Sequence, residues 1–166
     1  MSEQQPSRFG RLKKLDISGT KVARYTFYQV EGEPWIDSCP ALESNPRYYN
    51  ALLARSRKNL RRLRSGNVNS AQLAENRNED RALYPRHICK GWGQMVLQED
   101  EQAEIKALLD DDGTEVQFSQ ASCADFLDQL PDWIFDEYRM WCADPNSFVE
   151  ESAMGEDEKA DLEKNS

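Results

Sequence analysis

The residues of this 166-residue chain that could support chemistry are few and widely spaced. The cysteines stand at positions 39, 89, 123 and 142, and His87 is the only histidine. Zinc sites are usually built from closely spaced cysteine and histidine pairs, and the spacing from His87 to Cys89 is not a usual one. We therefore expect reduced thiols, a structural or surface imidazole, and no metal.

Two further patterns match ligand-binding loops only in part. Residues 110–113 have the sequence DDDG. Aligning Gly113 with the sixth position of a calcium loop puts Leu108 first and Ser119 twelfth, so the first and last ligands are lost. The GWG run at 91–93 lacks the third glycine and the following helix of a dinucleotide fingerprint. We expect no catalytic residues, no cofactor, and a protein that is not an enzyme.

Charge is distributed very unevenly along the chain, whose net charge is -9. Residues 1–66 carry 13 Lys and Arg against 6 Asp and Glu, whereas residues 99–166 carry 4 against 21. Such asymmetry predicts an electrostatic partner for one half, or attraction between the halves. No stretch approaches the roughly 20 apolar residues that span a bilayer, and the N-terminus does not resemble a secretory signal.

The N-terminal part of the chain predicts a flexible arm followed by a small hairpin. Residues 1–20 are polar and are typical of a mobile arm. Residues 22–30 are rich in β-branched and aromatic side chains and predict a strand. A turn signal follows at 31–34, and residues 35–39 can return as the second strand.

The clearest predicted element is a helix from Pro46 to Arg64. Asn45 can accept a backbone N–H as its N-cap, and proline suits the first helical position. One face should dock on the core, and the opposite face should pair with an acidic surface on this chain or a partner. The apolar face comprises Tyr49, Leu52, Leu53, Leu60 and Leu63, and the basic face comprises Arg55, Lys58, Arg61 and Arg62.

The middle of the chain is harder to assign. Residues from 70 to about 83 predict a polar helix that Pro85 interrupts. The run at 87–97 is apolar but contains two glycines, so periodicity does not separate helix from strand there. The acidic stretch at 99–112 could carry a short helical face.

The last part of the domain predicts two helices after a short turn and strand. The Asp112-Gly113 turn precedes a short strand at 116–118. Ser119 caps a helix that Pro131 stops, and a second helix follows at 132–142. This second helix spreads apolar side chains over several sides, so we expect it to be largely buried or to bind a partner.

Together these elements predict an α+β fold that is mainly α. It would combine the small N-terminal β-hairpin with a helical domain and a short second hairpin. We expect a flexible arm over residues 1–20, a single α+β domain over residues 21–150, and a disordered acidic tail over residues 151–166.

Large apolar side chains of the C-terminal half are candidates for a partner-binding surface, because a binding protein needs apolar surface that its partner can cover. The alternative is that these aromatic residues fill the core, where most large aromatic side chains lie. The candidate partner-binding residues are Trp92, Trp133, Phe135, Met140 and Trp141, together with Arg55, Arg61 and Arg62 from the basic face.

Three segments of the chain follow a recognisable order. Residues 43–53 have the sequence ESNPRYYNALL, and residues 76–92 have the sequence NRNEDRALYPRHICKGW. The third segment joins the Asp112-Gly113 turn to VQFS at 116–119 and continues to Phe148. Together they resemble the tail assembly chaperones of long-tailed bacteriophages, the group of the lambda-type G proteins, over roughly residues 40–150.

The resemblance implies a non-enzymatic assembly factor in the cytoplasm of the infected bacterial host. Such factors bind the long, apolar, helical tape-measure protein and help the tail-tube protein to polymerise around it. Two other functions stay open. One is a minor structural tail or neck protein of the virion. The other is a nucleic-acid-binding regulator that uses the Arg-rich helix, against which the acidic C-terminal half argues.

Overall fold

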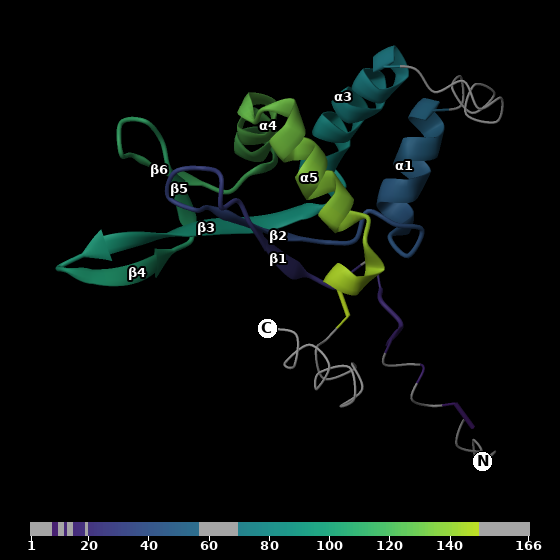
Figure 1. The fold of residues 1–166 in the computed structure, drawn as a ribbon, viewed down its shortest axis with the longest axis horizontal. Helices are drawn as coiled ribbons and strands as arrows, with labels where there is room; N and C mark the ends of the chain where they lie inside the picture. Colours follow the sequence, from purple (N-terminus) through teal and green to yellow (C-terminus); the bar gives the residue numbers. More distant parts are fainter. Residues whose placement is uncertain (1–7, 10–11, 13–14, 19, 57–69, 150–166) are drawn as a thin grey trace, which may run out of the picture.

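In the computed structural model, residues 8–9, 12, 15–18, 20–56 and 70–149 are described. The strands are β1 (Ala23–Thr26), β2 (Trp35–Ser38), β3 (Cys89–Gln98), β4 (Glu101–Ile105), β5 (Ala107–Leu109) and β6 (Glu115–Gln117). The helices are α1 (Pro46–Ser56), α3 (Ser70–His87), α4 (Gln120–Gln129), α5 (Asp132–Cys142) and the short 3-10 helix η2 (Pro145–Ser147). Figure 1 shows the helices gathered over one side of the strands.

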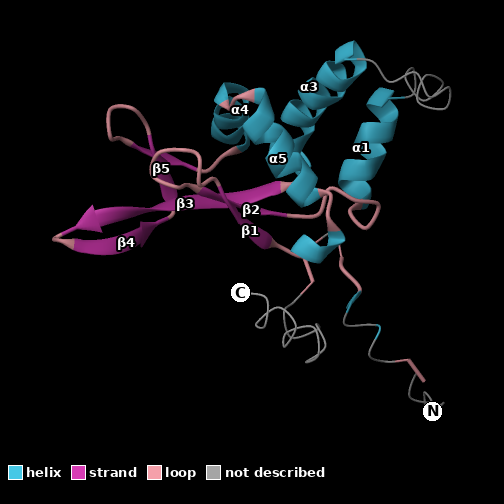
Figure 2. Cartoon of the chain, viewed as in Figure 1, coloured by secondary structure: helices cyan, strands magenta, loops and turns pink. Residues whose placement is uncertain are grey.

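A four-stranded antiparallel sheet with the order β1-β2-β3-β4 supports the helices. The long strand β3 pairs with two neighbours along different parts of its length. Trp35 of β2 lies opposite Gly93, and Ile105 of β4 lies opposite the next residue, Gln94. Strands β5 and β6 form a separate two-stranded sheet, and the strands are drawn in magenta in Figure 2.

The prediction of a mainly helical fold is wrong. Residues 89–98 form one continuous strand, and the stretch that could have carried a short helical face forms β4 and β5. Tertiary pairing decides this outcome, because β2 and β4 each supply hydrogen-bonding partners to part of β3. Gly93 permits the close approach: a Cβ there would lie 2.4 Å from the Ile105 carbonyl oxygen and 2.6 Å from the Trp35 ring.

The predicted break at Pro85 is also wrong, because α3 continues to His87 and contains Pro85 in its last turn. Proline lacks the backbone N–H that would donate to the carbonyl oxygen four residues earlier, so the helix loses one hydrogen bond. Because Pro85 stands two residues before the end of α3, little of the helix follows that break. The predicted helix from Pro46 is described as far as Ser56, and the rest of that prediction lies outside the described residues. The predicted acidic tail also lies outside them.

The local signals around α4 are confirmed. The Ser119 side chain accepts a hydrogen bond from the backbone N–H of Ser122, and the Ser122 side chain accepts one from the Ser119 N–H. This reciprocal capping box satisfies two backbone donors at the helix start. The helix ends before Pro131, and α5 begins immediately afterwards at Asp132.

The core lies between the sheet and α5, and Tyr138 is at its centre. The Tyr138 ring lies 5.1 Å from Tyr25 and 5.2 Å from Phe27, both at the N-terminal hairpin, and 5.7 Å from Tyr84 of α3. Its hydroxyl shares a hydrogen bond of 2.5 Å with Ser38 of β2. The buried hydroxyl is thereby satisfied, and the contacts position α5 firmly against the hairpin.

Candidate functional site

A groove of about 650 Å³ lies between α1, α3 and α5. These three helices come from distant parts of the chain and meet on the side of the molecule away from the β3–β4 hairpin (Figure 1). Apolar side chains supply most of its lining, and charged side chains lie among them. The lining residues are Ala41, Tyr48, Tyr49, Leu52, Leu53, Leu73, Asn76, Arg77, Asp80, Tyr84, Asp136, Arg139, Met140 and Ala143.

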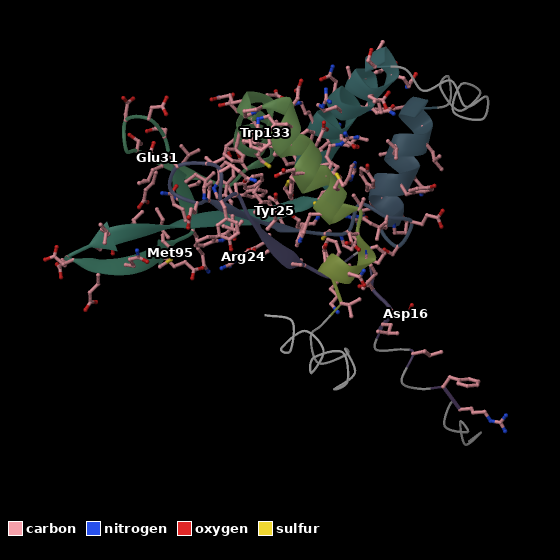
Figure 3. The ribbon with its side chains drawn as sticks, viewed as in Figure 1. Asp16, Arg24, Tyr25, Glu31, Met95 and Trp133 are labelled. Carbon is pink, nitrogen blue, oxygen red and sulfur yellow. The ribbon has the colours of Figure 1, made fainter. Side chains whose placement is uncertain are left out.

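The rim of the groove exposes large apolar side chains. Met140 of α5 is 73% exposed, and Leu73 of α3 is also exposed. Leu52 and Leu53 contribute the half-buried wall on α1. Trp133, labelled in Figure 3, stands seven residues before Met140 and so lies on the same face of α5. The exposed face of α5 therefore extends the apolar surface beyond the groove.

The floor of the groove is polar, and hydrogen bonds join its side chains to one another. The buried carboxylate of Asp80 accepts a hydrogen bond from the Tyr48 hydroxyl at 2.7 Å. It also accepts one from Nε of Arg139 at 2.7 Å. Burial raises the pKa of Asp80, and the nearby Arg139 charge and these hydrogen bonds oppose that rise. Because both Asp80 oxygens are engaged within the protein, this carboxylate ties α1, α3 and α5 together.

A second pair of charges borders the floor. Arg77 donates Nε and Nη2 to the two oxygens of Asp136 at 3.0 and 2.8 Å, a bidentate arrangement. Arg139 donates Nη1 to the same carboxylate at 3.0 Å. The hydrogen bond from Arg77 is the main reason why the pKa of Asp136 is lowered. Acidic and basic side chains therefore neutralise one another across α3 and α5.

This arrangement suits the burial of an apolar surface rather than the capture of an ion. The exposed side chains at the rim can lose their contact with water when a partner covers them, which favours association. The charged groups on the floor already have partners, so they contribute shape and rigidity. An amphipathic helix that lays its apolar face into a groove between helices is the recognition mode that fits these features.

The structure separates the predicted partner-binding residues into two groups. Trp133 and Met140 are exposed on α5, and Met140 lines the groove. Trp92 is buried, and its Nε1 donates to the Val116 carbonyl at 3.1 Å. Phe135 is completely buried in the core. Trp92 and Phe135 therefore fill the core and do not present a surface to a partner.

Among the remaining predicted residues, neither Trp141 nor Arg55 lines the groove. Trp141 is half-buried, with ring contacts to Tyr25 at 5.2 Å and Phe148 at 5.3 Å. Arg55 is exposed in the last turn of α1. Arg61 and Arg62 lie outside the described residues.

Sequence reasoning missed the polar floor and the leucine on α3. The available signal was a pair of opposite charges three residues apart in each helix: Arg77 with Asp80 in α3, and Asp136 with Arg139 in α5. Residues at this spacing are neighbours on a helix face. The pairs do not reveal by themselves that they meet across the two helices.

The four thiols and the single imidazole are all at least partly buried. All four cysteines are free and buried. Burial lowers the pKa of His87, and the positive charges of Arg86 and Lys90 lower it further. Within the described ranges, no group of three or more His, Cys, Asp or Glu side chains could hold a metal ion.

Comparisons of the chain with protein families, with curated proteins and with solved structures gave no match. Among the helices that the structure describes, none combines the length and the apolar character that a membrane span requires.

Proposed function

We propose that the groove between α1, α3 and α5 binds an apolar helical segment of a partner protein and keeps that segment from aggregating. The observation that carries the proposal is the exposed apolar rim over a floor whose charges are paired. A helix bound there would cover Met140 and Leu73 without leaving a buried charge unpaired. Most of its affinity would come from apolar burial and would persist at moderate salt.

The sequence resemblance supplies the identity of the partner within this proposal. The protein would be a tail assembly chaperone of a long-tailed bacteriophage, acting in the host cytoplasm without catalysis. Its client would be the tape-measure protein, which is long, apolar and helical. Tail-tube protein would join the complex as the tube polymerises around that client.

Co-expression with the tape-measure protein of the same phage tests this function. The chaperone should raise the soluble yield of the client, because covering exposed apolar helices lowers the concentration of aggregation-competent chains. Burial of one such side chain contributes about 1.5–3 kcal/mol. The double variant Leu73→Glu, Met140→Glu should therefore weaken binding by about a hundredfold or more.

Tyr28 offers a matched control, because it is 73% exposed, as Met140 is, and does not line the groove. Tyr28→Glu should leave the soluble yield of the client unchanged. Circular dichroism should show that both proteins keep the wild-type helix content. Equal yields with the groove variant and the control would contradict the proposed site.

Two other outcomes would favour the alternative functions. Several copies of the chain in each purified virion, without an effect on client solubility, would indicate a structural tail or neck protein. Tight binding to duplex DNA near physiological salt, with a steep dependence on salt concentration, would indicate a nucleic-acid-binding regulator.

A further inference from the structure

The β3–β4 hairpin extends away from the helices and exposes an apolar face (Figure 1). Met95 and Leu97 are two residues apart in β3, so their side chains lie on the same face of the strand. Leu97 is 75% exposed, and Met95 is exposed as well. Opposite them in β4 stand Glu104 and Gln102. Because a two-stranded ribbon is at best marginally stable in water, a partner that covers this face would stabilise the hairpin.

The free end of this hairpin is acidic. Its turn and the start of β4 carry Glu99, Asp100 and Glu101 and no basic residue. Beside Met95, Glu104 accepts a hydrogen bond from Arg24 of β1 at 3.4 Å. The β5–β6 turn belongs to the other face of the sheet, because the backbone N–H of Leu109 donates to Gln94, whose side chain points away from the Met95 face. Charge complementarity at the β3–β4 turn therefore favours an occupant that is both apolar and basic.

The N-terminal segment at 8–15 has the complementary composition. Its sequence, RFGRLKKL, places four basic residues among apolar ones and contains no acidic residue. Leu12 and Leu15 are both exposed in the structure. Figure 3 shows Asp16, which directly follows this segment, at the opposite end of the molecule from Met95. Each copy therefore carries the two complementary surfaces at its two ends.

We propose that residues 8–15 of one copy dock on the apolar face of the β3–β4 hairpin of a second copy. Leu12 and Leu15 would cover Met95 and Leu97, and the basic side chains would lie beside the acidic β3–β4 turn. The contact joins two different surfaces, so it is heterologous and can continue from copy to copy. The three-helix groove is a poorer site for this segment, because its arginines and aspartates are already paired with one another.

Analytical ultracentrifugation of the full chain tests the association. The monomer has a mass of 19.2 kDa, and the average mass should rise with protein concentration. Raising the salt from about 0.05 M to about 0.5 M should weaken association on the order of tenfold, because the Debye length falls severalfold. The double variant Leu12→Ser, Leu15→Ser should be monomeric. The double variant Met95→Ser, Leu97→Ser should be monomeric as well, and both should have unchanged circular dichroism.

Mixing the two double variants distinguishes this interface from others. Each variant retains one intact surface, so the mixture should form a heterodimer that grows no further. The unpaired surfaces in that heterodimer are both defective. A symmetric contact between two hairpins or two arms would not be restored by mixing.

Three results would overturn the proposal. The first is a wild-type chain that stays monomeric at high concentration and low salt. The second is a mixture of the two variants that stays monomeric. The third is association that survives in the double variant Leu12→Ser, Leu15→Ser but is lost in the double variant Arg61→Glu, Arg62→Glu. That result would identify the basic stretch around Arg61 and Arg62 as the occupant. The groove variant Leu73→Glu, Met140→Glu should associate normally, so failure of this proposal is distinct from failure of the proposed function.

Discussion

Phe135 and Met140 lie on the same helix, and replacing each with alanine should give very different losses of stability. Phe135 is completely buried, whereas Met140 is mostly exposed at the groove rim. The Phe135 ring lies 5.6 Å from the Tyr84 ring and 4.6 Å from the guanidinium carbon of Arg81. Phe135→Ala therefore removes a central core contact, and Met140→Ala removes a side chain that faces water.

The magnitudes follow from burial. A buried phenylalanine replaced by alanine costs about 3–5 kcal/mol through lost transfer free energy and the cavity left behind. Loss of the ring from beneath the Arg81 guanidinium adds about 0.5–2 kcal/mol. Met140→Ala should change the free energy of unfolding by no more than about 0.5 kcal/mol. For a chain of this size, 1 kcal/mol shifts Tm by about 2–4 °C, so Phe135→Ala should lower Tm by roughly 10 °C or more.

Urea unfolding followed by circular dichroism measures both changes, and an unchanged m-value would show that the two-state comparison is valid. Because the total stability of a domain is only about 5–15 kcal/mol, Phe135→Ala could unfold the chain outright. Phe135→Leu gives a graded test and should cost about 1.5 kcal/mol. A cost below about 1.5 kcal/mol for Phe135→Ala would refute its place in the core. A cost above about 2 kcal/mol for Met140→Ala would refute the exposure of the groove rim.

Three further perturbations test other parts of the structure. Gly93→Ala should destabilise the protein by about 3 kcal/mol in urea unfolding, because the new Cβ would press on the Ile105 carbonyl oxygen. An unchanged free energy of unfolding would contradict the β3–β4 geometry. The double change Glu99→Asn, Asp100→Gly should raise stability by about 1 kcal/mol, since both residues have positive φ, at 52° and 64°, in the β3–β4 turn. A loss of stability would mean that the turn does not have these backbone angles. The pKa of Asp136 is lowered in the folded protein. Its ion pairs therefore add stability at pH values above the ordinary pKa of 3.8, and this stability is lost as the pH falls through the folded pKa. Acid unfolding below about pH 4 should therefore become less steep in Asp136→Asn, and identical acid profiles would argue against this ion pair.

The candidate site could be anticipated from the sequence only in part. Trp133 and Met140 were among the predicted partner-binding residues, and the structure places both on the exposed face of α5. Phe135 was predicted with them but is buried, because α5 carries apolar residues on several sides and only its packing decides which side faces inward. Leu73 and Asp80 were missed, because their roles depend on helices that are distant in sequence.

Features that depend on neighbouring residues could be predicted from the amino-acid sequence alone. The capping box at Ser119, the stop at Pro131 and the hairpin around β1 and β2 follow from local hydrogen bonding, fixed backbone angles and side-chain shape. These signals act over a few residues, so they survive in any fold that accommodates them.

Packing between distant segments is what makes residues 89–98 and 101–105 strands and opens a groove between α1, α3 and α5. A strand is stable when another strand satisfies its backbone donors and acceptors, and the partners of β3 come from both sides of it in the sequence. The groove likewise depends on Arg139 of α5 reaching Asp80 of α3. Local periodicity does not specify such pairings, because they arise when distant segments pack together.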